Sequence, residues 1–243
     1  GERHGYLIGD AEGHSVIDAV RAAQQLPDAH ASPRWVAVGH SQGGHAALFT
    51  HQLGQSYAPE LHLLGTVAIA PAAEVRRTFG PSDDIVPRMV GIMMLYGAEA
   101  EYPSIHADDY VGAEVKAKAS IIDTGCSDEI IAELAGIPKA TFYAHDPLTT
   151  EPAQSMLVEN DPGQVRVDAP LFIVYGTADW YVVPDRAKAL FQRECGIGQI
   201  TAIHEVAGAD HGTVVSQGAA AITTWLQDRV DGLPAPNDCP AAP

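Results

Sequence analysis

One short segment of this sequence has the residue types of a nucleophilic serine site. Gly39-His40-Ser41-Gln42-Gly43 matches the pattern Gly-x-Ser-x-Gly, in which the serine lies on a tight turn between a strand and a helix. A chain of this composition contains the pattern by chance roughly 0.09 times, so the motif alone is a weak signal. Glycines suit the strained turn because neighbouring backbone passes close to a Cα that has no Cβ. The motif therefore predicts a nucleophile at Ser41 if a strand precedes it and a helix follows it.

A serine hydroxyl is a poor nucleophile until a base removes its proton, and the base needs an acid that fixes its tautomer. In sheet proteins with this serine turn, the three residues follow the chain order Ser, Asp or Glu, His. Asp179 and His211 satisfy that order, and each follows an apolar run that predicts a strand. Asp210 is the alternative acid, although an immediate neighbour of a histidine rarely reaches its Nδ1. The pattern predicts a Ser41-His211-Asp179 triad, with the backbone N–H of Gln42 as one oxyanion donor.

Strands and helices alternate on both sides of a long central segment. Short apolar runs that end at glycine or proline predict buried strands, and apolar residues at helical spacing predict helices. This alternation predicts an α/β fold with a mostly parallel sheet and helices on both faces. The predicted strands are residues 33–39, 61–70, 170–176 and 200–206, and the predicted helices are residues 13–26, 42–55, 183–195 and 212–230.

The segment between the two halves of the predicted sheet is too long for a plain connection. Residues 72–169 contain short helical pieces broken by glycine and proline, which predicts a mostly helical cap. Residues 1–71 and 170–243 then form the core that contains the sheet. The cap has a cluster of apolar residues that includes Met93 and Met94.

The overall composition excludes several classes of protein. The 243 residues contain 31 acidic and 14 basic side chains, a formal charge of −17, which argues against nucleic acid and against anionic lipid surfaces as partners. An apolar content of 46% argues against overall disorder, and no apolar stretch approaches the ~20 residues of a membrane span. The three cysteines, Cys126, Cys195 and Cys239, lack the spacing of a metal site. Their pattern alone leaves open whether they are free thiols or form one disulfide.

Taken together, these segments resemble the α/β-hydrolases of the secretory lipase type, which include fungal lipase A-like enzymes and bacterial relatives. The resemblance implies a secreted carboxylic ester hydrolase that needs no metal or organic cofactor, with a helical lid in place of the cap. It also implies a late disulfide between Cys195 and Cys239. The resemblance is carried by Ser15–Ala23, the serine turn with Gly44, Gly176-Thr177-Ala178-Asp179 with the following Val182-Val183-Pro184, and Trp225–Val230.

The chain departs from the family pattern near the site. His40 lies where the family often has tyrosine, and Trp180 and Tyr181 replace smaller or acidic residues. We expect these three side chains to narrow the mouth of the substrate pocket. Met93 and Met94 are candidates for the acyl pocket, with a place in the core of the cap as the alternative.

The family also has an N-terminal portion that supplies early sheet strands, the second oxyanion donor and a cysteine. Upstream of Ser41 this sequence has room for only one helix and one strand. The resemblance therefore implies that the N-terminal strands are missing from this chain and that an N-terminal fragment of the same precursor binds it. That fragment could be joined by a disulfide to Cys126.

The leading hypothesis is an extracellular serine esterase or lipase that acts through an acyl-enzyme. A serine peptidase or acyltransferase on the same fold is the first alternative. A non-catalytic binding protein with a hydrolase fold is the second.

Overall fold

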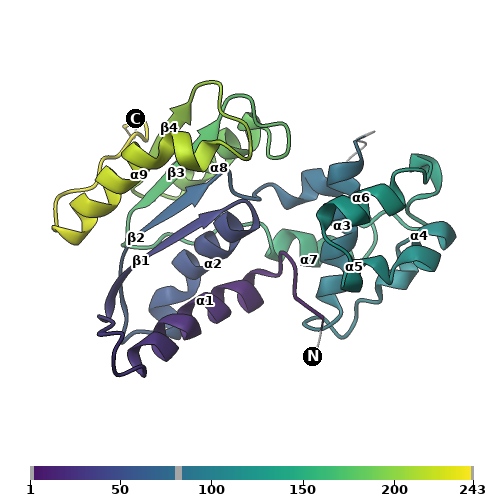
Figure 1. Cartoon of the computed structure of the whole chain (residues 1–243), viewed down its shortest axis with the longest axis horizontal. Helices are drawn as coiled ribbons and strands as arrows, with labels where there is room; N and C mark the ends of the chain where they lie inside the picture. The colour runs from purple at the N-terminus through teal and green to yellow at the C-terminus, as the bar shows by residue number, and fades with distance from the viewer. Residues whose placement is uncertain (1–2, 80–83, 242–243) are drawn as a thin grey trace. The chain divides into compact units, whose positions relative to one another are not determined.

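The computed structural model describes residues 3–79 and 84–241, so residues 1–2, 80–83 and 242–243 of the predicted domain ranges lie outside it (Figure 1). The chain divides into two compact units. The sheet unit comprises residues 9–74 and 162–243, and the helical unit comprises residues 1–8 and 75–161.

The sheet unit contains a four-stranded parallel sheet in the order β1-β2-β3-β4. Parallel strands buried on both faces have nearly continuous apolar sequences, and β3 is buried at every position. All four strands agree with the predicted runs to within one residue at each end, which confirms the predicted parallel sheet. The strands are β1 (Arg34–His40), β2 (His62–Ile69), β3 (Leu171–Gly176) and β4 (Thr201–Val206).

Helices cover both faces of this sheet, as the alternating pattern predicts (Figure 1). Successive side chains of a strand point to opposite faces, so neighbouring residues of β2 and β3 join different cores. Val67 and Phe172 pack with α9 (Val214–Val230), where the rings of Phe172 and Trp225 stack. Ala68 and Ile173 pack instead with α2 (Gln42–Tyr57) and α8 (Pro184–Gly196).

The first helix, α1 (Gly9–Gln24), begins four residues before the predicted start at Gly13. Glycine commonly marks the end of a helix, but here two glycines lie within it because α1 passes very close to α2. A Cβ on Gly9 would lie 2.1 Å from the Phe49 ring, and a Cβ on Gly13 would lie 3.1 Å from the Phe49 carbonyl carbon. The predicted start of this helix was therefore wrong, because the close packing of α1 on α2 cannot be read from the local sequence.

The helical unit is built from short helices, as the broken pattern between residues 72 and 169 predicts. Its longest helix, α3, is buried at most positions, which suits the centre of such a unit. The α-helices are α3 (Ile85–Ala98), α4 (Ala113–Lys118), α5 (Ile121–Thr124), α6 (Ser127–Leu134) and α7 (Ala153–Glu159), with 3₁₀ turns η1 (Val75–Phe79), η2 (Ala107–Asp109) and η3 (Lys139–Thr141).

Residues 3–8 belong to the helical unit, whereas the predicted boundary placed residues 1–71 with the sheet. Gly97 of α3 lies against this segment, because a Cβ there would be 2.7 Å from the Tyr6 backbone nitrogen. The Arg3 guanidinium donates hydrogen bonds to Glu99 and Asp123. These long-range contacts explain why residues 3–8 belong to the helical unit.

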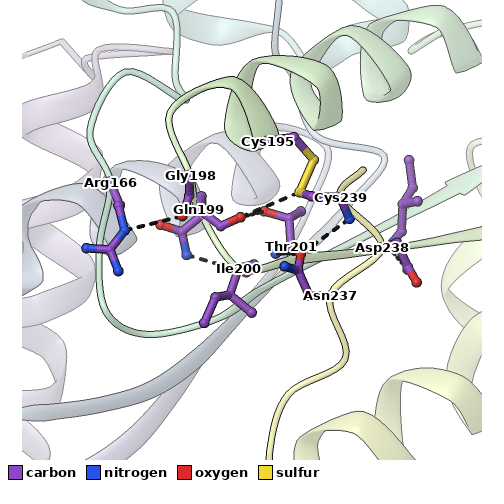
Figure 2. Close-up of a disulfide and its surroundings, with 10 residues drawn as sticks. Arg166, Cys195, Gly198, Gln199, Ile200, Thr201, Asn237, Asp238 and Cys239 are labelled. Carbon is purple, nitrogen blue, oxygen red and sulfur yellow. Dashed lines mark hydrogen bonds between the residues drawn. A yellow bond between two sulfur atoms is a disulfide. The ribbon is translucent and has the colours of Figure 1, made fainter. Parts of the chain in front are cut away.

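The C-terminal tail covers the outer edge of β4 and is fixed there by the expected disulfide between Cys195 and Cys239 (Figure 2). The Asp238 N–H donates to the Thr201 carbonyl at 2.9 Å, and the Asp238 carboxylate accepts from the Ile203 N–H at 2.9 Å. An edge strand otherwise presents unpaired backbone groups that promote aggregation. The tail protects this edge.

Because the disulfide closes a loop of 44 residues, its removal should destabilise the sheet unit. We expect the double variant Cys195→Ser/Cys239→Ser to lose about 2–4 kcal/mol of unfolding free energy in urea titrations. Cys126→Ser is the matched control, because Cys126 is exposed, belongs to the helical unit and forms no disulfide among the described residues. Equal unfolding midpoints for the double variant and this control would contradict the assignment.

Glu194, next to Cys195 on α8, is a buried carboxyl group with 1% exposure. Its Oε2 has no hydrogen-bond partner in the described part of the chain. Burial raises the pKa of Glu194 to about 7, and the neighbouring Arg193 offsets this only in part. The ionised form therefore disfavours the folded state.

The raised pKa of Glu194 makes stability depend on pH. Below the unfolded-state pKa of about 4.3, Glu194 is protonated in the folded and the unfolded chain, and burial of its side chain carries no ionisation penalty. This stability is lost as the pH rises through the folded-state pKa of about 7. Glu194→Gln should therefore exceed the wild type in stability by up to about 4 kcal/mol at pH 8, with no gain at pH 4. Urea unfolding across this range measures the difference; a difference that does not grow with pH would contradict the account.

Candidate active site

Ser41 lies on the turn that joins β1 to α2, where the motif predicts it. Its backbone has φ 60° and ψ −119°, a region that non-glycine residues rarely adopt. Gly39, two residues before Ser41, must be glycine, because a Cβ there would lie 1.8 Å from the Gly43 carbonyl oxygen. The Ser41 N–H donates to the Ile69 carbonyl at 2.9 Å, and the Ser41 carbonyl accepts from the Ala72 N–H at 3.1 Å. The end of β2 thus holds the turn.

Two further predicted residues meet Ser41 at the carboxyl ends of the strands. His211 Nε2 lies 2.9 Å from Ser41 Oγ, and His211 Nδ1 lies 2.7 Å from Asp179 Oδ2. Asp179 is buried, and its Oδ1 accepts hydrogen bonds from the backbone N–H groups of Tyr181 and Val182, both at 2.9 Å. The carboxylate is therefore fixed on one side by backbone and faces the imidazole on the other.

The loops after β3 and β4 lie side by side, which brings the acid to the histidine. The Ala178 N–H donates to the Ala209 carbonyl at 2.9 Å. A Cβ on Gly176 would lie 2.3 Å from the same carbonyl oxygen, so only glycine fits there. Adjacent parallel strands end at one edge of a sheet, and this edge carries the three side chains.

Asp210, the alternative acid, has a different set of partners. Its Oδ1 accepts from the N–H groups of Gly212 and Thr213 and from the Thr213 hydroxyl, and these bonds lower the pKa of Asp210. This carboxylate closes the turn that precedes α9. The imidazole Nδ1 of His211 faces Asp179 instead.

Two of the predicted pocket residues lie beside His211, and a third packs on one of them. The rings of His40 and Tyr181 lie 4.5 Å and 5.3 Å from the His211 ring, measured between centroids. Burial and the nearby His211 lower the pKa of His40, which favours a neutral imidazole there. Trp180 packs on Tyr181 and remains 57% exposed. These side chains form an aromatic border next to the imidazole.

The other two predicted pocket residues belong to α3 of the helical unit. Met94 has no exposed surface. It belongs to the core of that unit, which was the alternative to a place in the acyl pocket. Met93 is partly exposed. A role for these two side chains at the substrate pocket stays a prediction.

Sequence patterns did not identify two polar residues behind the serine turn, Glu12 and His45. Both are buried, and His45 Nδ1 lies 2.6 Å from Glu12 Oε2. The Gln42 side chain donates to Glu12 Oε1 at 2.7 Å. The spacing of Gly9 and Gly13 was the available signal, because it marks the face of α1 that meets α2.

The described residues contain no group of three or more His, Cys, Asp or Glu side chains placed to hold a metal ion. Within the same part of the chain, no helix has the length and apolar character needed to cross a membrane.

Comparisons with known proteins agree with this fold. Lipase 10 from Candida albicans is 26% identical over 98% of this chain and 55% of its own length, and a "probable inactive lipase" from Mycobacterium tuberculosis is 22% identical over 91% and 51%. The chain thus spans about half the length of the curated relatives it matches. Candida antarctica lipase A superposes with a TM-score of 0.78 at 19% identity, over 98% of this chain and 59% of that structure.

The superposition supports the α/β-hydrolase fold that the alternating strands and helices predict. The family model for secretory lipases matches residues 1–238, which is nearly the whole chain. This chain therefore belongs to the secretory lipase family.

Proposed function

We propose that the protein is a secreted serine hydrolase that cleaves carboxylic esters through an acyl-enzyme. The observation that carries this proposal is the continuous set of contacts from Ser41 Oγ to His211 and from His211 to Asp179, at 2.9 Å and 2.7 Å. These distances fall within the range expected of a nucleophile, its base and the acid that orients the base. The proposal extends to secretion because of the family to which the chain belongs.

In the proposed reaction, Ser41 Oγ attacks the ester carbonyl carbon while His211 Nε2 takes the hydroxyl proton. Asp179 keeps Nδ1 protonated and stabilises the imidazolium. The imidazolium then gives the proton to the departing alcohol. Water next attacks the carbonyl carbon of the acyl-enzyme while His211 takes a proton from it, and His211 returns that proton to Ser41 Oγ as the carboxylic acid leaves. Negative charge on the carbonyl oxygen needs preorganised donors, and Gln42 at the first turn of α2 offers its backbone N–H.

Two other functions would use the same fold. A peptidase or an acyltransferase would share the acyl-enzyme and differ in the leaving group or the acceptor. A non-catalytic binding protein is a further candidate, since one relative is described as a probable inactive lipase. The complete Ser-His-Asp contact in this chain favours an enzyme.

The proposal includes a second chain segment that completes the sheet. Among the described residues, β1 pairs with β2 alone, and Val38 in its middle is 48% exposed. An unpaired edge with an exposed apolar residue is a template for another strand. We assign this edge to an N-terminal fragment of the same precursor, with the exposed Cys126 as a candidate for a disulfide to it.

Intact mass of the purified protein before and after reduction tests this fragment. We expect a second polypeptide, bound without a covalent bond or released from Cys126 by reduction. A single fully active species of 25.7 kDa would contradict the assignment.

Substitutions at the triad test the catalytic roles. Ser41→Ala and His211→Ala should each remove most hydrolysis of p-nitrophenyl esters, and Asp179→Asn should lower kcat by ~10⁴ because the imidazole then has the wrong tautomer. Asp210→Asn is the matched control at the neighbouring carboxylate and should keep most activity. The reverse ranking of the two Asp→Asn variants would transfer the orienting role to Asp210.

A fluorophosphonate probe and a panel of substrates separate the candidate functions. We expect the probe to label Ser41 and p-nitrophenyl esters to react faster than aminoacyl amides, with no strong competition from added alcohols. Faster amide cleavage would indicate a peptidase, and preferential transfer to alcohols would indicate an acyltransferase. A folded protein that the probe does not label would support a binding protein.

A further inference from the structure

We propose that Glu12 and His45 are positioning residues that hold Gln42, and with it the first turn of α2, behind the nucleophile. The proposal rests on the proposed function, because that function uses the Gln42 backbone N–H as an oxyanion donor. Glu12 and His45 would act through Gln42 without touching the substrate.

The Glu12 carboxylate uses both of its oxygens for this purpose. Oε2 lies 2.6 Å from His45 Nδ1, and Oε1 accepts a hydrogen bond from Gln42 Nε2 at 2.7 Å. Gln42 and His45 are the first and fourth residues after Ser41, and residues three apart share one face of a helix. One carboxylate thus ties together the face of the turn that follows the nucleophile.

The position of Glu12 on α1 is unusual for a charged residue. The buried positions of α1 are Gly9, Glu12, Gly13 and Ile17, a helical stripe in which an apolar residue would normally lie. Carboxylates are almost never fully buried unless they have a partner. The two glycines let α1 approach α2 closely enough for the Glu12 side chain to reach it. Both the glycine spacing and the carboxylate therefore serve the same contact.

The chemistry of the contact favours a fixed geometry. One proton must lie between Glu12 Oε2 and His45 Nδ1, because two facing lone pairs would repel at 2.6 Å. Hydrogen bonds to a carboxylate are short and strong, and this one is shielded from water because both side chains are buried. A negative group near the N-terminus of a helix is also favoured by the helix dipole.

A second buried imidazole on α2 shows what an ordinary structural contact looks like. His51 lies ten residues after Ser41 along the chain, and its Nδ1 is 3.0 Å from the hydroxyl of Thr66 on β2. That contact joins helix to sheet and does not reach Gln42. Removing it should affect stability without moving the oxyanion donor, so it provides a matched control.

The test compares Glu12→Gln and Gln42→Met with Thr66→Val in the enzyme together with any segment that copurifies with it. Gln42→Met removes the side-chain bond to Glu12 and leaves the backbone N–H in place. The measurements are kcat and KM for p-nitrophenyl butyrate, the Ki of a trifluoromethyl ketone, which forms an oxyanion on the nucleophile, and the melting temperature.

We expect Glu12→Gln and Gln42→Met to lower kcat about tenfold to hundredfold and to raise the Ki by a similar factor, with KM within about twofold. Thr66→Val should lower the melting temperature and keep kcat and Ki close to those of the wild type. If Glu12→Gln does not fold, Gln42→Met alone decides the question.

Folded Glu12→Gln and Gln42→Met enzymes with wild-type kcat and Ki would overturn this proposal and leave the triad intact. A wild type that neither hydrolyses the ester nor reacts with a fluorophosphonate would overturn the proposed function first, and this proposal with it. The two failures are therefore distinguishable.

Discussion

The backbone of Ser41 has φ 60°, and holding a non-glycine residue in such a region costs on the order of 1–3 kcal/mol. The surrounding sheet supplies the forces that keep it there. Hydrogen bonds to Ile69 and from Ala72 fix the turn to the end of β2, and close backbone contacts at Gly39 leave no room for a side chain. The other parts of the site depend on this turn, because it aims the hydroxyl at His211 and begins the helix that carries Gln42.

The rest of the sheet unit places the partners of Ser41 at the same edge. Parallel pairing of β3 with β4 sets the Asp179 and His211 loops side by side, and Gly176 permits their contact. On the opposite side of the turn, α1 and α2 pack closely through Gly9 and Gly13. The serine turn is thus held by β2 from one direction and by the α1–α2 contact from another.

Much of this arrangement could be predicted because the information is local. The apolar runs of β2 and β3 identify buried strands, and the chain order of Ser41, Asp179 and His211 at strand ends needs no knowledge of distant contacts. The start of α1 could not be predicted in this way, since Gly13 reads as a boundary until the ring of Phe49 is known to lie against this helix. The contact of Glu12 with His45 was missed for the same reason. Residues 3–8 likewise join the helical unit through Gly97 and Arg3, a choice that no local pattern reveals.

The central claim is that Ser41 forms a covalent acyl-enzyme, and trapping that species tests it most directly. The enzyme would be mixed with a p-nitrophenyl ester, quenched in acid within the first turnover, digested and analysed by mass spectrometry. The account predicts a burst of about one p-nitrophenol per chain and a single acylated peptide that contains Ser41. Ester hydrolysis without an acylated Ser41 peptide, or acylation at another residue, would contradict it.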